Sequence, residues 1–278
     1  LSPGSRSTPL VVALARAAAM GELELIDVID ERSAAFVALG HARVTGRAAF
    51  VVCTSGTAPA HWYPAILEAG ESQVPLVLLS ADRPTELHHG GAPQTVDQIA
   101  LFGARVRFFA DLGDPQESEA WLAGVRRTVA QAVARAAFPL PGPVHVNVRA
   151  RKPLEPTGAL DATARMAEAV VDGILGRGVA TITRPTATLR PSDTLRVAER
   201  LARAERPLVV LGPIAAWARR SEIVAFLARF GAPFHAEPAS QVRFGDRPAG
   251  LAIDGLDLLL ASELLGGNLG APTRHAEP

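Results

Sequence analysis

Short apolar runs alternate with longer amphipathic segments over residues 1–155. Continuous apolar runs of about four to eight residues are typical of strands that are buried on both faces of a sheet. The amphipathic segments between them are typical of crossover helices, which place consecutive strands parallel. We therefore expect an α/β domain with a parallel sheet in the middle of three layers. The expected strands are residues 23–28, 49–53, 76–80, 106–109 and 144–148, and the expected helices are residues 9–20, 32–46, 58–69 and 117–137.

The alternation stops after residue 155. Residues 156–191 are rich in Pro, Gly and Thr, which is typical of an interdomain linker. A second α/β pattern follows, and its few strands would leave the faces and edges of a parallel sheet uncovered. We therefore expect residues 192–278 to form only part of an α/β domain. The expected elements are helices from Ser192 to Ala204 and at residues 222–230, and strands at residues 208–211, 233–236 and 256–260.

The composition limits the kinds of partner and the cellular compartment that we expect for this protein. The 278 residues contain 28 basic and 28 acidic side chains, so the formal net charge is zero. A neutral chain has no overall electrostatic attraction for nucleic acid or for an anionic membrane. The single cysteine, Cys53, cannot form a disulfide within the chain, and no apolar stretch reaches the roughly 18 residues of a membrane span. We therefore expect a cytoplasmic protein without a membrane span or a nucleic-acid partner.

Polar and glycine-rich loops follow the expected strands, at the edge where open parallel sheets bind ligands. Ser5 and Arg6 lie in a Pro-Gly turn before a helix, which suits a carboxylate or a phosphate. The alternative is an ordinary turn with a solvated arginine. Glu31 follows the first expected strand and starts a helix, where a carboxylate is also favoured by the helix dipole alone.

Two further loops carry candidate residues. Ser55, Gly56 and Thr57 form a turn through which backbone could approach a flat ligand, although it lacks the glycine spacing of dinucleotide sites and the lysine of a P-loop. Arg83 and Gln94 lie on the loop after the next strand. We expect no metal ligand in these loops, because the adjacent histidines there point apart and no carboxylate has ligand spacing.

Together, these loops resemble the N-terminal, pyrimidine-binding domain of thiamine-diphosphate enzymes, and in particular a family of menaquinone-pathway synthases. The resemblance covers residues 1–155, and residues 192–260 resemble that family's central domain more loosely. The matching segments are Pro3-Gly4-Ser5-Arg6-Ser7-Thr8-Pro9-Leu10, Asp30-Glu31-Arg32, Thr54-Ser55-Gly56-Thr57-Ala58, Tyr63-Pro64, Glu68-Ala69, Ala81-Asp82-Arg83-Pro84 and Gly91-Ala92-Pro93-Gln94-Thr95.

The resemblance implies a transferase that decarboxylates 2-oxoglutarate and adds the resulting succinyl-semialdehyde carbanion to isochorismate in a 1,4-addition. Thiamine diphosphate and Mg²⁺ are the implied cofactors, and a homodimer or homotetramer is the implied assembly. Glu31 is the implied catalytic residue, because the family's glutamate at this position hydrogen-bonds N1′ of the aminopyrimidine. By the same resemblance, Ser55, Gly56 and Thr57 flank the pyrimidine ring, and Ser5, Arg6, Arg83 and Gln94 bind substrate.

Two departures from the family pattern limit these expectations. Pro93 stands where the family usually has Asn, which removes a side-chain amide and a backbone donor beside Gln94. The Gly-Asp-(Gly/Ser)…Asn segment that anchors Mg²⁺ and the diphosphate is not found, Gly245-Asp246-Arg247 being the nearest string. We therefore expect that the diphosphate-binding domain and the first helix and strand of the pyrimidine domain lie outside these residues. The 278 residues alone would then be inactive.

Two alternatives stay open from the sequence. One is another thiamine-diphosphate carboligase or decarboxylase of the acetolactate-synthase type. The other is a non-catalytic, truncated α/β module. Arg6 and Arg83 favour the synthase, because isochorismate carries two carboxylates and a pyruvate-only enzyme has no such second substrate.

Overall fold

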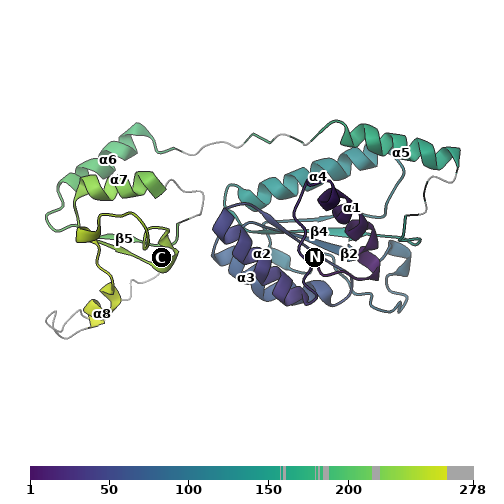
Figure 1. Cartoon of the computed structure of the whole chain (residues 1–278), viewed down its shortest axis with the longest axis horizontal. Helices are drawn as coiled ribbons and strands as arrows, with labels where there is room; N and C mark the ends of the chain where they lie inside the picture. Colours follow the sequence, from purple (N-terminus) through teal and green to yellow (C-terminus); the bar gives the residue numbers. More distant parts are fainter. Residues whose placement is uncertain are drawn as a thin grey trace. The chain divides into compact units, whose positions relative to one another are not determined.

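The computed structural model describes residues 1–156, 158, 161–178, 180, 182–183, 188–214 and 220–261. The chain divides into two compact units, Leu1–Thr186 and Ala187–Pro278 (Figure 1). Both units contain parallel strands connected through helices. No helix among the described residues is long and apolar enough to cross a membrane.

The first unit is built on a four-stranded parallel sheet in the order β1-β2-β4-β3. Its register aligns Cys53 with Ser80, Ser80 with Asn147, and Asn147 with Asp111. This row of residues lies near the carboxyl ends of all four strands and marks one edge of the sheet. The strands are β1 (Ala49–Cys53), β2 (Leu76–Asp82), β3 (Phe108–Asp111) and β4 (Pro143–Arg149).

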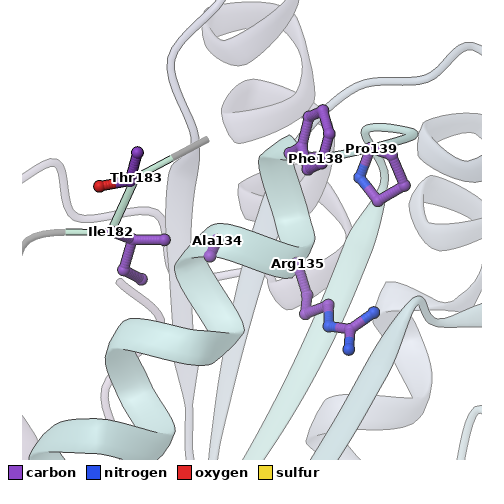
Figure 2. A pocket seen from close by; sticks show the side chains of 6 residues that line it. All are labelled: Ala134, Arg135, Phe138, Pro139, Ile182 and Thr183. Carbon is purple, nitrogen blue, oxygen red and sulfur yellow. The ribbon is translucent and has the colours of Figure 1, made fainter. Parts of the chain in front are cut away.

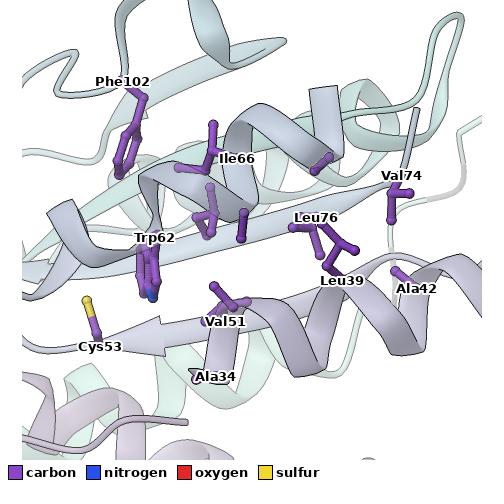
Figure 3. Packing of buried hydrophobic residues seen from close by; sticks show 14 of the residues in the cluster. Ala34, Leu39, Ala42, Val51, Cys53, Trp62, Ile66, Val74, Leu76 and Phe102 are labelled. Atoms are coloured by element: carbon purple, nitrogen blue, oxygen red, sulfur yellow. The ribbon is translucent and has the colours of Figure 1, made fainter. Parts of the chain in front are cut away.

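Helices cover both faces of this sheet, as the continuous apolar strands require. On one face, α2 and α3 pack with Trp62 against β1 and β2 (Figure 3). On the other face, α4 packs Ala132 and Ala136 against Val77 and Val144. The three-layer α/β fold expected from the sequence is thus confirmed. The helices of this unit are α1 (Thr8–Ala19), α2 (Glu31–Thr45), α3 (Tyr63–Glu71), α4 (Glu119–Ala137) and α5 (Ala162–Leu175), with short 3₁₀ turns η1 (Ser5–Ser7), η2 (Ala58–Trp62), η3 (Thr85–Leu87) and η4 (Gly103–Arg105).

Two elements expected in this unit differ in the structure. Residues 23–28 are not a strand, because they pair only with Leu1 and Ser2 and so build no ladder: the Leu1 amine donates to the Ile26 carbonyl, and the Val28 amide donates to the Leu1 carbonyl. The helix expected at residues 58–69 is divided into η2 and α3. Pro64 near the start of α3 lacks the amide that would continue the preceding turn into it.

The segment expected to be a linker contains a helix, α5, that the sequence did not predict. The Asp161 carboxylate caps α5 by accepting the Ala164 amide at 2.8 Å, and Ile174 is buried. The Arg126 guanidinium on α4 donates to the Gly178 carbonyl just after α5. Figure 1 shows α5 beside α4, so this helix belongs to the first unit.

The second unit has two parallel strands, β5 and β6, around a small core of Leu227, Phe234, Ala236 and Val242. The strand expected at residues 256–260 is instead a helix, because a short leucine-rich run has no period that excludes a helix and leucine favours one. Residues 262–278 lie outside the described residues. The elements are α6 (Pro191–Ala202), β5 (Val209–Leu211), α7 (Arg220–Phe230), β6 (Phe234–Ala236), η5 (Pro238–Ser240), η6 (Ala249–Leu251) and α8 (Leu256–Ala261).

Candidate functional site

The loop that carries Ser5 and Arg6 starts beside the end of β1. The Ser2 amide donates to the Val52 carbonyl at 2.8 Å, which places the following residues at the carboxyl edge of the sheet. A Cβ on Gly4 would lie 2.5 Å from the Cβ of Thr54. Only glycine therefore allows this close approach, and it brings the loop of Arg6 against the turn that follows β1.

The Ser55-Gly56 turn is contacted by both candidate residues of the next loop. The Ser55 hydroxyl accepts a hydrogen bond from the Arg83 guanidinium, and the Ser55 carbonyl accepts one from the Gln94 amide at 3.0 Å. Gly56 has a φ of +84°, and a Cβ there would lie 2.7 Å from Cγ of Gln94. Despite the neighbouring Pro93, Gln94 thus reaches the turn, with its own backbone in the left-handed region.

Arg6 and Arg83 lie close together at this edge. Arg6 is 8% exposed, and its guanidinium donates to the carbonyl of Ala150, directly after β4, at 2.7 Å. Burial lowers the pKa of Arg83, and the positive charge of Arg6 lowers it further, whereas Asp82 acts in the opposite direction. Within the described residues neither guanidinium forms an ion pair. Two such donors without a carboxylate partner are chemically suited to an anionic ligand.

Glu31 lies at the same edge, as the first residue of α2. The Asp30 carboxylate caps this helix by accepting the Ser33 amide at 2.7 Å, so the backbone that carries Glu31 is held in place. The Glu31 side chain is half-buried. Burial raises the pKa of the Cys53 thiol, and the negative charge of Glu31 adds to this effect, so the carboxylate lies near the end of β1.

Ser5 and Thr57 make fewer contacts with the other candidate residues than those residues make with one another. Both are exposed, and among the residues that the structure describes no hydrogen bond joins either side chain to Arg6, Arg83 or Gln94. The structure therefore brings Arg6, Ser55, Gly56, Arg83 and Gln94 into one cluster, with Glu31 at its margin and Ser5 and Thr57 beside it in sequence.

Sequence reasoning missed a buried polar group directly beneath this cluster. Asp82, Gln98 and Asn147 are each 0% exposed and are connected by hydrogen bonds. Asn147 could have been noticed as a polar residue within an apolar strand. Gln98 gave no signal, because it lies in an irregular loop whose path depends on the whole fold.

A shallow pocket of about 200 Å³ lies elsewhere in the first unit (Figure 2). It is at the C-terminal end of α4, next to the start of β4, and therefore at the opposite edge of the sheet from the cluster. Its lining is mostly apolar and offers no set of convergent polar groups. The lining residues are Ala134, Arg135, Phe138, Pro139, Ile182 and Thr183.

The cluster fits one half of a site for an aminopyrimidine ring. Within the described part of the chain, no hydrogen bond or ion pair engages the Glu31 carboxylate, so it can accept a hydrogen bond from a protonated ring nitrogen. Glu31 and the Ser55-Gly56 turn lie at the ends of neighbouring segments, as a flat ligand between them requires. The same cluster has no group of acidic or histidine side chains suited to a metal ion, and we find none among the described residues.

The chain is similar to known proteins over part of their length. Residues 1–101 match the family model described as "Thiamine pyrophosphate enzyme, N-terminal TPP binding domain". This part of the chain is therefore similar to the N-terminal domain of thiamine-diphosphate enzymes. The curated relatives share one name, and the chain is similar to part of proteins named 2-succinyl-5-enolpyruvyl-6-hydroxy-3-cyclohexene-1-carboxylate synthase.

Three of these relatives illustrate the similarity. The synthase of Sorangium cellulosum is 44% identical over 258 residues, which cover 91% of this chain and 41% of that protein. The synthase of Halorubrum lacusprofundi is 43% identical over 271 residues, covering 95% and 43% respectively. The synthase of Bacillus velezensis is 40% identical over 263 residues, covering 95% and 44%. The chain thus spans less than half the length of the curated relatives it matches.

Proposed function

We propose that this chain supplies the pyrimidine-binding half of the active site of a synthase that decarboxylates 2-oxoglutarate and adds the product carbanion to isochorismate. The observation that carries the proposal is the pair of guanidiniums, Arg6 and Arg83, which lie at the edge of the sheet beside the Ser55-Gly56 turn and have no carboxylate partner among the described residues. A substrate with two carboxylates satisfies both donors.

Glu31 has the central part in the proposed chemistry. Thiamine diphosphate, when bound, supplies the electron sink for decarboxylation. The Glu31 carboxylate would accept a hydrogen bond from a protonated N1′ of the pyrimidine and so favour the imino tautomer, in which N1′ carries a proton that the exocyclic amine has given up. The partly buried position of Glu31 strengthens this hydrogen bond, because the local dielectric constant is lower than that of water.

The other residues orient and enclose the substrates. Arg6 and Arg83 bind substrate carboxylates, Arg6 from a position fixed by the Ala150 carbonyl. Gln94 and Ser5 bind substrate at the exposed side of the cluster. Ser55, Gly56 and Thr57 flank the pyrimidine ring, where the absence of a Cβ at Gly56 leaves the backbone accessible to neighbouring groups.

Further parts of the proposal rest on the similarity to these enzymes. Mg²⁺ and the diphosphate are anchored by residues other than the cluster described here, and the active enzyme is a homodimer or homotetramer. Residues 1–155 form the pyrimidine-binding domain and residues 192–278 contribute to the central domain. A cytoplasmic location agrees with the free, buried Cys53.

The test compares Arg6→Ala and Arg83→Ala with wild type in the full-length enzyme, with 2-oxoglutarate, isochorismate, thiamine diphosphate and Mg²⁺. Loss of a charge-assisted contact to a carboxylate costs about 1.5–3 kcal/mol, so we expect KM for isochorismate to rise about 10- to 100-fold. Arg127→Ala, an exposed arginine on α4, is the control.

Three outcomes separate the possibilities. A raised KM in both cluster variants with an unchanged control supports the proposal. Unaltered use of isochorismate by Arg6→Ala contradicts the assigned substrate contact. Turnover of pyruvate but not of isochorismate by the wild-type enzyme would place the protein with the acetolactate-synthase type instead.

A further inference from the structure

A network of buried, hydrogen-bonded side chains lies beneath the Ser55-Gly56 turn. Ser80, Asp82, Gln98 and Asn147 are each 0% exposed, although they lie between the apolar cores of the two faces of the sheet. Buried polar groups are retained at low cost only when their hydrogen bonds are complete. These side chains satisfy that condition by bonding to one another and to backbone.

The donor and the acceptor of each hydrogen bond in this network follow from the carboxylates that it contains. The carboxylates of Asp82 and Asp111 can only accept, so the Asn147 side chain must present its Nδ2 to them, at 2.9 and 3.2 Å. Its Oδ1 then faces the opposite way. There it accepts from the Ser80 hydroxyl at 2.9 Å and from Nε2 of Gln98 at 2.9 Å.

Gln98 connects Asn147 to the turn, and the donors and acceptor of its side chain are fixed in the same way. Its Nε2 donates to Asn147 and also to the Ala81 carbonyl at 3.2 Å. With both protons of Nε2 used, Oε1 is the remaining group, and it accepts the backbone amide of Gly56 at 3.0 Å. A side chain at this position therefore needs two donors and one acceptor in the geometry of a glutamine.

The network of buried side chains ends at two parts of the proposed site. At one end it holds the Gly56 amide, and at the other Oδ1 of Asp82 accepts the backbone amide of Arg83 at 2.7 Å. Gln98 also anchors the loop that presents Gln94, whose amide contacts the Ser55 carbonyl from the exposed side. One loop thus contacts the turn through a buried glutamine and an exposed one.

We propose that Gln98 is a positioning residue of the active site: through Asn147 and Asp82 it holds the Ser55-Gly56 turn in register with Arg83. The expected effect of Gln98 on catalysis rests on the proposed function, whereas its role in holding the turn does not. Gln98 touches no substrate, and it acts by keeping two ligand-contacting segments at a fixed separation.

The first measurement follows hydrogen–deuterium exchange in the full-length protein. Gln98→Leu removes the acceptor of the Gly56 amide, so exchange in the peptide covering residues 54–58 should become at least about 10-fold faster. Gln98→Glu keeps an acceptor for that amide and should retain most of the protection. Val144→Ala removes a buried methyl pair at the start of β4, away from the network, and controls for a general loss of stability.

The second measurement is steady-state kinetics of the same variants. A misplaced turn should raise KM for isochorismate about 10- to 100-fold in Gln98→Leu, with Gln98→Glu between Gln98→Leu and wild type. Val144→Ala should lower the thermal midpoint without changing KM. If Gln98→Leu does not fold, KM decides: Gln98→Glu lacks the donors to Asn147 and Ala81 and should still raise KM, whereas a KM equal to that of Val144→Ala would overturn the positioning role.

The outcomes separate the inference from the function on which it rests. Exchange and KM in the Gln98 variants that match those of Val144→Ala would overturn the positioning role. A wild-type enzyme that does not consume isochorismate would overturn the proposed function, and the exchange data would still decide whether Gln98 holds the turn.

Discussion

Glu31 shows how much of the proposed chemistry depends on one side chain. Replacing it by Gln keeps the size of the side chain and removes the negative charge that favours proton transfer to the aminopyrimidine. We expect Glu31→Gln to lower kcat about 10²- to 10⁴-fold, the range for loss of a positioned acid–base group. The measurement is turnover of isochorismate by the full-length enzyme at saturating thiamine diphosphate.

A matched control for this change is Glu71→Gln, at the exposed C-terminal end of α3. It removes the same charge from a site without a proposed role, and its activity should stay within about two-fold of wild type. Activity of Glu31→Gln equal to that of the control would exclude Glu31 as the group that contacts N1′.

His145 makes the stability of the domain depend on pH. Its imidazole is 0% exposed and packs edge-on to Phe102 with ring centroids 4.9 Å apart. Burial lowers the pKa of His145 to about 4, with only partial opposition from Asp111. Between the ordinary value of 6.5 and about 4, the unfolded chain binds a proton that the folded domain excludes.

The free energy of unfolding should therefore fall as pH decreases through this window, by about 3 kcal/mol at pH 4 from this residue. Urea unfolding of wild type and His145→Gln at pH 7 and pH 4.5 measures the effect. The variant, which has no proton to gain, should lose less stability between the two pH values. Equal losses would show that His145 titrates normally in the folded state.

Among the elements of the first unit, α5 is the helix that could not be predicted from the sequence. Its surroundings are rich in Pro, Gly and Thr, and only Ile174 is deeply buried, so the apolar stripe is short. Residues 23–28 show the converse, because their composition predicts a strand and their hydrogen-bonding partners determine that none forms. Both results depend on neighbours that are distant in sequence.

Packing of α5 on α4 can be measured with one truncation. Ile174 is 6% exposed, and Ile174→Ala should lower the free energy of unfolding of the first unit by about 2–4 kcal/mol. Val171 on the same helix is 38% exposed, so Val171→Ala should cost about 0.5 kcal/mol. Denaturant unfolding followed by tryptophan fluorescence distinguishes the two. Similar values for both variants would mean that α5 does not pack as a part of this unit.

For the whole molecule, the alternation of apolar and amphipathic segments was sufficient to predict the three-layer arrangement. The positions of Ser55, Gly56, Arg83 and Gln94 at one edge followed from their places after strands, whereas Glu31 follows residues 23–28, which form no strand. The network of Gln98, Asn147 and Asp82 could not be predicted, because it requires the order β1-β2-β4-β3 and the register that aligns Ser80 with Asn147. Neither the order nor the register is encoded in any single segment.

The bond between Arg6 and the Ala150 carbonyl joins residues 144 positions apart. During synthesis from the N-terminus, the arginine leaves the ribosome long before the residue that orients it, so the proposed anion site is completed only when β4 has joined the sheet. If Arg6 and Arg83 bind substrate as proposed, a dianionic substrate would bind the finished domain in preference to any earlier intermediate, and its binding would stabilise the folded state.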